Sequence, residues 1–364
     1  MTWTRRGLLA AGLAGLSGCL GARRPTASDC PELGTAEARV GFVGDVMLGR
    51  GVNDRWLDRD PSGVWGDTLE RLRALDGLVA NLECCVATGG TRWPGHTYYF
   101  RADPAFAVPA LAAAKVSVAS LANNHALDFR EPALRATRRH LGDAGVAHAG
   151  AGPRLDAALE PAVVEAGDLT VATVALTNQR PAYAADEAGA GTAYASLSPI
   201  DPVTRSRVGT ALERARAHDP DLLVATLHWG PNWEIAPDAT QRAFARWLVD
   251  RGVDVVHGHS AHVLQGVEVY RGRPIVYDAG DLVDDYVHKD GYHNKRSALF
   301  ELVVADGRLD ALRVVPVEIQ GEAATLASPE AAAWVRRAVR DRSAPFGTRV
   351  ERAGAGLSIP LGGC

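Results

Sequence analysis

The sequence has no excess of positive charge. Its 364 residues carry a formal net charge of −4, and no stretch in the body of the chain forms a run of lysine and arginine. Binding to nucleic acid therefore has no electrostatic support, and a polyanionic partner would have to be bound at a local basic site. Aromatic residues are few as well, but hydrophobic residues make up 47% of the chain, which is ample for the core of a soluble globular protein.

Cysteine is also scarce. The five cysteines include no Cys-x-x-Cys pair, which argues against a zinc site built from thiolates. Cys84 and Cys85 are adjacent, where a disulfide would be strained, so we expect both to be buried as small apolar residues. Cys30 and Cys364 lie near the two ends of the chain and could form a disulfide outside the cytoplasm.

The apolar stretch near the N-terminus, residues 7–16, is too short to cross a bilayer. It follows Arg5 and Arg6 and ends in Leu-Ser-Gly before Cys19, which resembles the lipobox of bacterial lipoproteins. We therefore expect residues 1–18 to be a lipoprotein signal peptide and Cys19 to be lipidated. The paired arginines also resemble a twin-arginine signal; a general secretory leader that happens to carry two arginines is the alternative.

The rest of the chain is expected to divide into three parts. Residues 19–38 are rich in Arg, Pro, Thr, Ser, Glu and Ala and predict a flexible tether, which the lipid would anchor. Residues 39–345 contain no linker composition and predict a single domain, and the Gly-rich tail at 346–364 is expected to need no structure. A lipid anchor would place the protein at the cell membrane of a bacterium, on the extracytoplasmic side.

Short apolar runs alternate with segments of helical spacing up to about residue 256, and hairpin-like strands follow. This order predicts an α/β sandwich with two sheets inside and helices outside. The expected strands are residues 40–46, 77–82, 116–121, 163–165, 169–176, 222–227, 253–256, 267–270, 274–277, 298–304 and 309–317. The expected helices are residues 65–75, 104–115, 131–144, 203–217, 239–251 (with Asp238 as N-cap) and 331–342.

Polar residues able to bind a metal or an anion follow five of the expected strands. Ligands of α/β sheets bind at the carboxyl ends of the strands, so we expect these side chains to converge. Asp and Asn are common in turns, but five strand ends that supply carboxylate, amide and imidazole groups favour a site. Such a mixture suits Mn, Zn or Fe better than Ca or Mg. The residues are Asp45, Asn81, Glu83, Asn124, His125, His228, His259 and His262.

Three imidazoles fall within six residues at His257, His259 and His262. Crowded imidazoles repel one another when protonated and bind transition metals when neutral, so a metal site is the first hypothesis. A histidine-rich turn that makes ordinary hydrogen bonds is the alternative. His257 is expected to be structural, and His96, in a long loop, is expected to be solvated or part of a lid.

The short motifs that contain these residues resemble, in their order along the chain, those of the CapA family of poly-γ-glutamate capsule synthesis proteins, over roughly residues 39–285. That family is similar to the calcineurin-like metallophosphoesterases, so the resemblance implies a four-layer αββα sandwich around a metal centre. The matching motifs are Gly-Asp-Val-Met-Leu-Gly-Arg at 44–50, Asn-Leu-Glu at 81–83, Asn-Asn-His at 123–125 with Asp128, His-Trp-Gly at 228–230 and Gly-His-Ser-Ala-His-Val at 258–263.

The resemblance also implies roles for individual residues. His125 would be a general acid, and Asp128 would orient it or cap the next helix. Arg50 could bind a carboxylate or phosphate through its fork, or simply begin a helix at the surface. The expected ligands of one or two divalent metal ions are Asp45, Glu83, Asn124, His228, His259 and His262.

The sequence departs from the metallophosphoesterase pattern at Met47, at Glu83, which stands where the bridging carboxylate is usually Asp, and in the spacing of two histidines; it departs from the CapA pattern at Asp281. Met47 stands where a histidine ligand is usual, and a thioether is a poor ligand for a hard divalent ion. His259 and His262 are three residues apart, so both reach one site only if the chain turns between them. Asp281 stands where the CapA family usually has asparagine. These departures favour one metal over a complete two-metal centre.

The resemblance implies a metal-dependent hydrolase or transferase that acts on poly-γ-glutamate or another anionic envelope polymer, beside membrane-bound synthase subunits. A non-catalytic factor for polymer assembly or anchoring, on the same fold, is the alternative. A plain phosphodiesterase or nucleotidase is disfavoured by the same departures. Trp229 and Trp233 could line a groove for a polymer or pack in the core.

Overall fold

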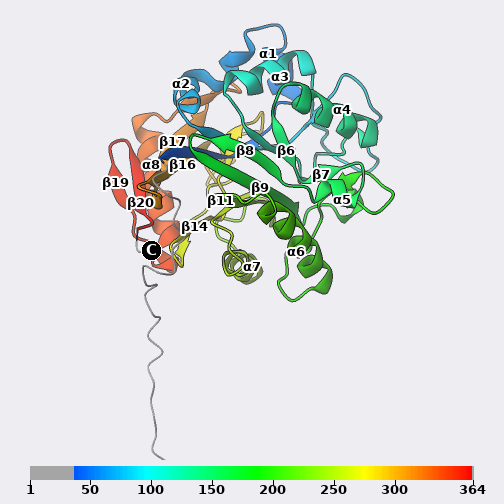
Figure 1. Ribbon diagram of the computed structural model, residues 1–364. Coiled ribbons are helices and arrows are strands. Elements are labelled where there is room, and N and C mark those ends of the chain that lie inside the picture. Colours follow the sequence, from blue (N-terminus) through cyan, green and yellow to red (C-terminus); the bar gives the residue numbers. More distant parts are fainter. Residues whose placement is uncertain (1–36, 363–364) are drawn as a thin grey trace, which may run out of the picture.

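The computed structural model describes residues 37–362 and consists of two stacked β-sheets with helices on their outer faces (Figure 1). The predictions made for Arg5, Arg6, Cys19, Cys30 and Cys364 lie outside these residues. In the described part of the chain, no helix combines the length and the apolarity that a membrane span requires.

The larger sheet has ten strands and contains both early and late parts of the chain. Its order is β19-β20-β17-β16-β1-β2-β5-β6, with β15 beside β1 and β18 beside β17. Strands β1, β2, β5 and β6 are parallel, whereas β16, β17 and β20 are antiparallel. The bounds are β1 Ala38–Val46, β2 Gly77–Leu82, β5 Val118–Ser120, β6 Ala147–Ala149, β15 Asp281–Val283, β16 Arg296–Ala305, β17 Arg308–Ile319, β18 Ala324–Leu326, β19 Glu351–Ala353 and β20 Gly356–Pro360.

The smaller sheet has six strands in the order β13-β14-β12-β11-β9-β8. Strands β9, β11, β12 and β14 are parallel, and a hairpin closes each edge. The bounds are β8 Ala162–Ala166, β9 Leu169–Thr177, β11 Leu222–His228, β12 Val255–His259, β13 Val267–Tyr270 and β14 Arg273–Val276. Two small ribbons pair β3 Cys85–Val86 with β4 Arg101–Ala102, and β7 Ala151–Gly152 with β10 Gly191–Thr192.

Three hydrophobic clusters hold the layers together. One lies between the sheets and joins Phe42 of β1 to Val224 of β11, and two others join the outer face of each sheet to its helices. The four-layer αββα sandwich is therefore confirmed. The helices that cover the larger sheet are α1 Arg50–Trp56, η2 Pro61–Thr68, α2 Leu69–Arg73, α3 Pro104–Ala113 and α4 Arg130–Asp143. Those that cover the smaller sheet are α5 Leu155–Ala158, α6 Pro202–Arg216 and α7 Ala239–Val249. Helix α8 Pro329–Ser343 packs on the cluster between the sheets, and the short 3₁₀ helices are η3 Pro181–Tyr183 and η4 Ala344–Phe346.

Local signals explain where several helices begin. Asp238 accepts a hydrogen bond from the backbone N–H of Gln241, whose side chain accepts one from the backbone N–H of Asp238, so the predicted N-cap is part of a capping box. The side chains of Asp103 and Asp201 accept hydrogen bonds from the first turns of α3 and α6, and each is followed by a proline that cannot donate a backbone hydrogen bond. Cys84 and Cys85 are free thiols and buried, as expected.

The prediction that residues 346–364 need no structure is wrong for part of the tail. Strand β20 extends the larger sheet by pairing with β17, and β19 pairs with β20. Leu357 and Ile359 alternate with half-buried neighbours and enter the cluster between the sheets. The high glycine content obscured this two-residue period, which is the usual sign of a strand with one buried face.

The buried carboxylate of Glu301 in β16 generates a prediction about stability. Arg71 holds it with two hydrogen bonds, from Nε to Oε1 at 2.6 Å and from Nη2 to Oε2 at 2.9 Å. Arg71→Ala leaves this charge buried and unpaired, so it should lower the free energy of unfolding by about 2 kcal/mol in urea titrations. Arg135→Ala, which removes an exposed pair with Glu131, should change it little; equal effects of the two variants would contradict the prediction.

Candidate metal centre

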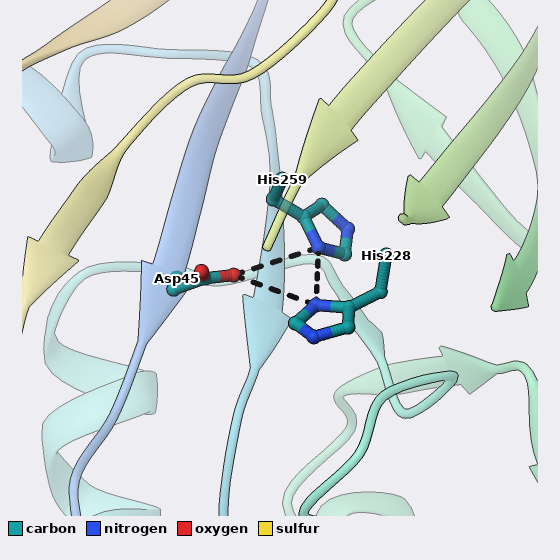
Figure 2. Close-up of side chains that lie close together, drawn as sticks. All are labelled: Asp45, His228 and His259. Atoms are coloured by element: carbon teal, nitrogen blue, oxygen red, sulfur yellow. Dashed lines mark hydrogen bonds and ion pairs between the residues drawn. The ribbon is translucent and has the colours of Figure 1, made fainter. Parts of the chain in front are cut away.

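The ends of strands β1, β2, β11 and β12 meet between the two sheets. Asp45 is aligned with Asn81 in the larger sheet, and His228 is aligned with His259 in the smaller one. Asp45, His228 and His259 point toward one another (Figure 2), and all three are buried. Parallel strands carry their carboxyl ends to the same edge of a sheet, which is why side chains far apart in the sequence converge here.

The distances within this first group suit a metal ion. Asp45 Oδ1 lies 3.8 Å from His228 Nδ1 and 3.5 Å from His259 Nδ1, and the two nitrogens are 2.9 Å apart. Ligand bonds of about 2.0–2.2 Å, as in zinc sites, place neighbouring ligand atoms roughly 3–4 Å apart. Asn81 donates a hydrogen bond of 2.7 Å from Nδ2 to Asp45 Oδ1 and so helps to fix the carboxylate.

A second group shares Asp45 with the first. One ligand atom each from Asp45, Glu83 and His262 lies within 4.8 Å of the others. His262 Nδ1 is 3.1 Å from Asp45 Oδ2 and 2.9 Å from Asp281 Oδ1. The chain turns sharply before His262, since Ser260 and His262 have φ values of 110° and 57°. This turn is the condition under which both His259 and His262 can reach one site.

Several buried atoms around these groups have no hydrogen-bond partner among residues 37–362. A buried polar atom without a partner costs free energy, and a cation would satisfy atoms that all carry lone pairs. Both carboxylate oxygens of Glu83 are in this state, and Oε1 lies 3.9 Å from the equally unpaired Nε2 of His228. The others near the expected motifs are Asp45 Oδ2, Asn124 Oδ1, His257 Nε2 and Asp281 Oδ2.

The protonation of the site also fits a divalent ion. Burial lowers the pKa of His228 to about 3 and also holds the pKa of His259 well below its usual range, so both imidazoles are neutral and able to bind metal. Burial and the nearby charge of Asp45 raise the pKa of Glu83 well above its usual value. Burial acts in the same direction on Asp45, but the hydrogen bond and the positive charge of His262 outweigh it and lower the pKa of that carboxyl. The negative charges of Asp45 and Glu83 thus disfavour each other, and a bound cation would stabilise both.

A hydrogen bond with Thr226 determines which nitrogen of His259 carries the lone pair that faces Asp45 and His228. Thr226 Oγ1 is 3.0 Å from His259 Nε2 and 3.1 Å from His257 Nδ1. When Nε2–H of His259 donates to Thr226, the lone pair of His259 lies on Nδ1, which faces Asp45 and His228. His257 therefore lies one step behind the ligands, which fits its expected structural role.

His125 and Asp128 form a buried pair beside the second group. His125 Nδ1 is 2.7 Å from Asp128 Oδ2, and the opposite nitrogen, Nε2, is 3.8 Å from Glu83 Oε1. Asp128 does not cap α4, which begins after Phe129 without a side-chain cap, so it orients His125 instead. The ring of Phe100 stacks on His125 with centroids 3.8 Å apart and blocks movement of the imidazole on that side.

His96 and Tyr183 lie next to the pair of His125 and Asp128, a position that was not predicted from the sequence. His96 Nδ1 is 3.0 Å from Asp128 Oδ1, and the hydroxyl of Tyr183 is 2.8 Å from His96 Nε2. The side chain of His96 is fully buried, so the expectation that it is solvated is wrong. The reason is stacking between the rings of His96 and Tyr183, which the sequence separates by 87 residues.

The remaining expected residues lie at the edge of the site or in the core. Met47 is fully buried in the cluster under the helices of the larger sheet, so its sulfur packs as a core atom. Arg50 begins α1 and binds Asp285 through Nε and Nη2 at 3.1 and 2.6 Å. Trp229 is buried, whereas Trp233 is half-buried and its ring is 5.5 Å from that of His262.

Comparison with known proteins places this site in context. Residues 39–286 match the family described as "Bacterial capsule synthesis protein PGA_cap", a span that includes every expected ligand. A Mycobacterium tuberculosis (strain H37Rv) protein named "probable polyglutamine synthesis accessory protein" is 32% identical over 355 residues, covering 84% of this chain and 91% of its own. "Capsule biosynthesis protein CapA" of Bacillus anthracis is 28% identical over 77% of this chain and 67% of its own, and "PGA biosynthesis protein CapA" of Bacillus subtilis (strain 168) is 28% identical over 76% and 70%.

Metal binding should stabilise the fold measurably. Adding Mn²⁺ or Zn²⁺ at about 100 times its dissociation constant to chelator-treated protein should raise the Tm by about 5 °C, because the ion relieves repulsion among buried carboxylates. Asp45→Ala removes the ligand that both groups share and should abolish the increase. The Tm is measured by differential scanning fluorimetry. An equal increase of the Tm in Asp45→Ala would show that the ion binds elsewhere.

The role of Thr226 can be tested by removing its hydroxyl alone. Thr226→Val keeps the volume of the side chain but frees the His259 tautomer, so metal affinity measured by calorimetry should fall by about 10- to 100-fold. Thr173→Val in β9 is the matched control, since this buried threonine has no hydrogen-bond partner in the described chain for its hydroxyl. Similar losses in both variants would show a general packing effect instead.

Proposed function

The chain belongs to the bacterial capsule synthesis protein family, and from that membership we propose that it acts in the synthesis of poly-γ-glutamate or a related anionic envelope polymer. We propose further that it does so as a metal-dependent hydrolase or transferase. The observation that carries this proposal is the His125–Asp128 pair, whose free nitrogen faces Glu83 beside two groups of candidate ligands. The relatives named for polyglutamine and capsule synthesis support the choice of polymer.

The proposed ion is Mn, Zn or Fe, which suits a set of imidazole and carboxylate ligands. Asp45, His228 and His259 would hold it, and Glu83 and His262 would complete the site or hold a second ion. When bound, such an ion acts as a Lewis acid on a carbonyl or phosphoryl oxygen and makes water a stronger nucleophile.

The chain's own contribution is the placement of a proton. Asp128 accepts a hydrogen bond from Nδ1 of His125 and stabilises the doubly protonated ring, which leaves Nε2–H directed at the site. In cleavage of a γ-glutamyl amide, water forms the new C–O bond and the C–N bond breaks. His125 protonates the leaving nitrogen, and the proton lost by the attacking water restores the imidazole.

The place of action is part of the proposal. The N-terminal motif around Cys19 supports a lipid anchor on the extracytoplasmic face of the membrane, where a capsule polymer leaves the cell. Membrane-bound synthase subunits are the proposed protein partners, in line with the word "accessory" in the name of the mycobacterial relative.

One observation favours a second function, a non-catalytic role in polymer assembly or anchoring. Met47 takes the place of a histidine ligand, and its side chain is buried in the core, so it supplies no donor to the site. A site with fewer ligands could hold an ion that stabilises the fold without taking part in catalysis.

Substitution of His125 separates the two functions. His125→Ala removes the proton donor but no member of the two groups that contain Asp45, so the purified full-length protein should retain the metal held there while cleavage of poly-γ-glutamate falls by about 10²- to 10⁴-fold. Chain length can be followed by gel electrophoresis and metal content by mass spectrometry. The control is His218→Ala, at an exposed position after α6. Metal binding without any turnover by the wild type would support the assembly role, and turnover that is unchanged in His125→Ala would overturn the proposed mechanism.

A further inference from the structure

A cavity of about 300 Å³ lies beside the candidate metal centre and has no part in the mechanism above. Its lining includes Arg50, Arg92 and Arg101, which come from α1, the loop before β4, and β4 itself. The size is at the lower end of the range of about 300–1,000 Å³ found for small-ligand sites. Three arginines from separate segments around one cavity call for a physical explanation, because like charges repel.

The cavity is joined to the catalytic pair through Phe100. One face of this ring stacks on His125, with centroids 3.8 Å apart, and Arg50 Cζ lies 4.8 Å from the ring centroid. The next residue in the chain, Arg101, lines the cavity, and so does Phe129, which follows Asp128. A linear ligand could therefore occupy the cavity while a neighbouring part of it reaches His125.

Aromatic rings hold the three guanidinium groups in place. Arg92 Cζ lies 5.0 Å from the ring centroid of Tyr99, and Arg101 Cζ lies 4.4 Å from that of Phe129. Stacking on a ring restrains a guanidinium group but leaves its N–H donors free at the edge of the plane. The arrangement is thus organised for binding before a ligand arrives.

Two of the three positive charges are not neutralised within the described part of the chain. Arg50 is paired with Asp285, but neither Arg92 nor Arg101 has an acidic group within 4.0 Å among residues 37–362. Two aspartates also line the cavity and offset part of the charge. Of these, Asp103 accepts the hydrogen bond that caps α3, and Asp54 lies in an exposed position on α1.

We propose that this cavity binds carboxylate groups of the polymer next to the bond that reacts, with Arg92 and Arg101 as the main contacts. The inference rests on the proposed function, because it assigns a subsite to the same substrate. A guanidinium group binds a carboxylate through two parallel hydrogen bonds, and a glutamyl chain repeats one carboxylate per unit. Two unpaired arginines beside the catalytic pair match such a repeating anion.

Calorimetric titration with γ-linked triglutamate tests the cavity without requiring turnover. The double variant Arg92→Gln/Arg101→Gln should raise the Kd of the full-length, metal-loaded protein for this peptide by roughly tenfold or more per arginine. Metal content and Tm should stay at the wild-type values, which excludes misfolding as the cause. Arg154→Gln, which lines a different cavity, is the matched control and should bind as the wild type does.

The outcomes distinguish this inference from the proposed function. Triglutamate binding that is absent in the wild type, or unchanged in the double variant, overturns the subsite, whether or not the polymer is cleaved. Binding of inorganic phosphate that the peptide does not displace would also overturn it, because the cavity would then be selective for another anion. Loss of peptide binding in the double variant, together with no cleavage by the wild type, supports the subsite and rejects the hydrolase.

Discussion

The site depends on one buried negative charge, the carboxylate of Asp45. This residue lies in β1, between β2 and β15 in the larger sheet, and it is fully buried where the two sheets meet. A carboxylate in such a place must be compensated, and the compensation comes from the hydrogen bond that Asn81 donates and from His262, which follows β12 of the smaller sheet. The same charge that would hold an ion therefore also fixes how the two sheets face each other at this edge.

The sequence alone was sufficient to predict the site residues that lie at the ends of strands. Asp45, His228 and His259 each close an apolar run, so their convergence followed from the geometry of parallel strands. The pair of His125 and Asp128 was predicted from a motif, and the structure selects orientation of His125 over helix capping as the contact that Asp128 makes. The layered fold followed from the alternation of helices and strands together with the family resemblance.

Other features depend on contacts that no local pattern records. His96 is buried because Tyr183, far along the chain, stacks on it, and both reach Asp128. Asp281 was noted only as a departure from the family pattern, yet it pairs with His262, because β15 lies beside β1. Strand β20 was not predicted because the tail around it is rich in glycine and because its partner β17 precedes it by about forty residues.

The order of strands in the larger sheet has a consequence for how the protein is made. Strand β1, which carries Asp45, pairs with β16, and that strand leads through β17 to β20 at residues 356–360. A nascent chain on the ribosome therefore cannot close this sheet until nearly all of the described residues have been synthesised. Until residues 296–305 have been synthesised, β1 lacks its neighbour β16 and exposes an edge open to mispairing, so a chaperone that covers this edge would act on a late stage of biogenesis.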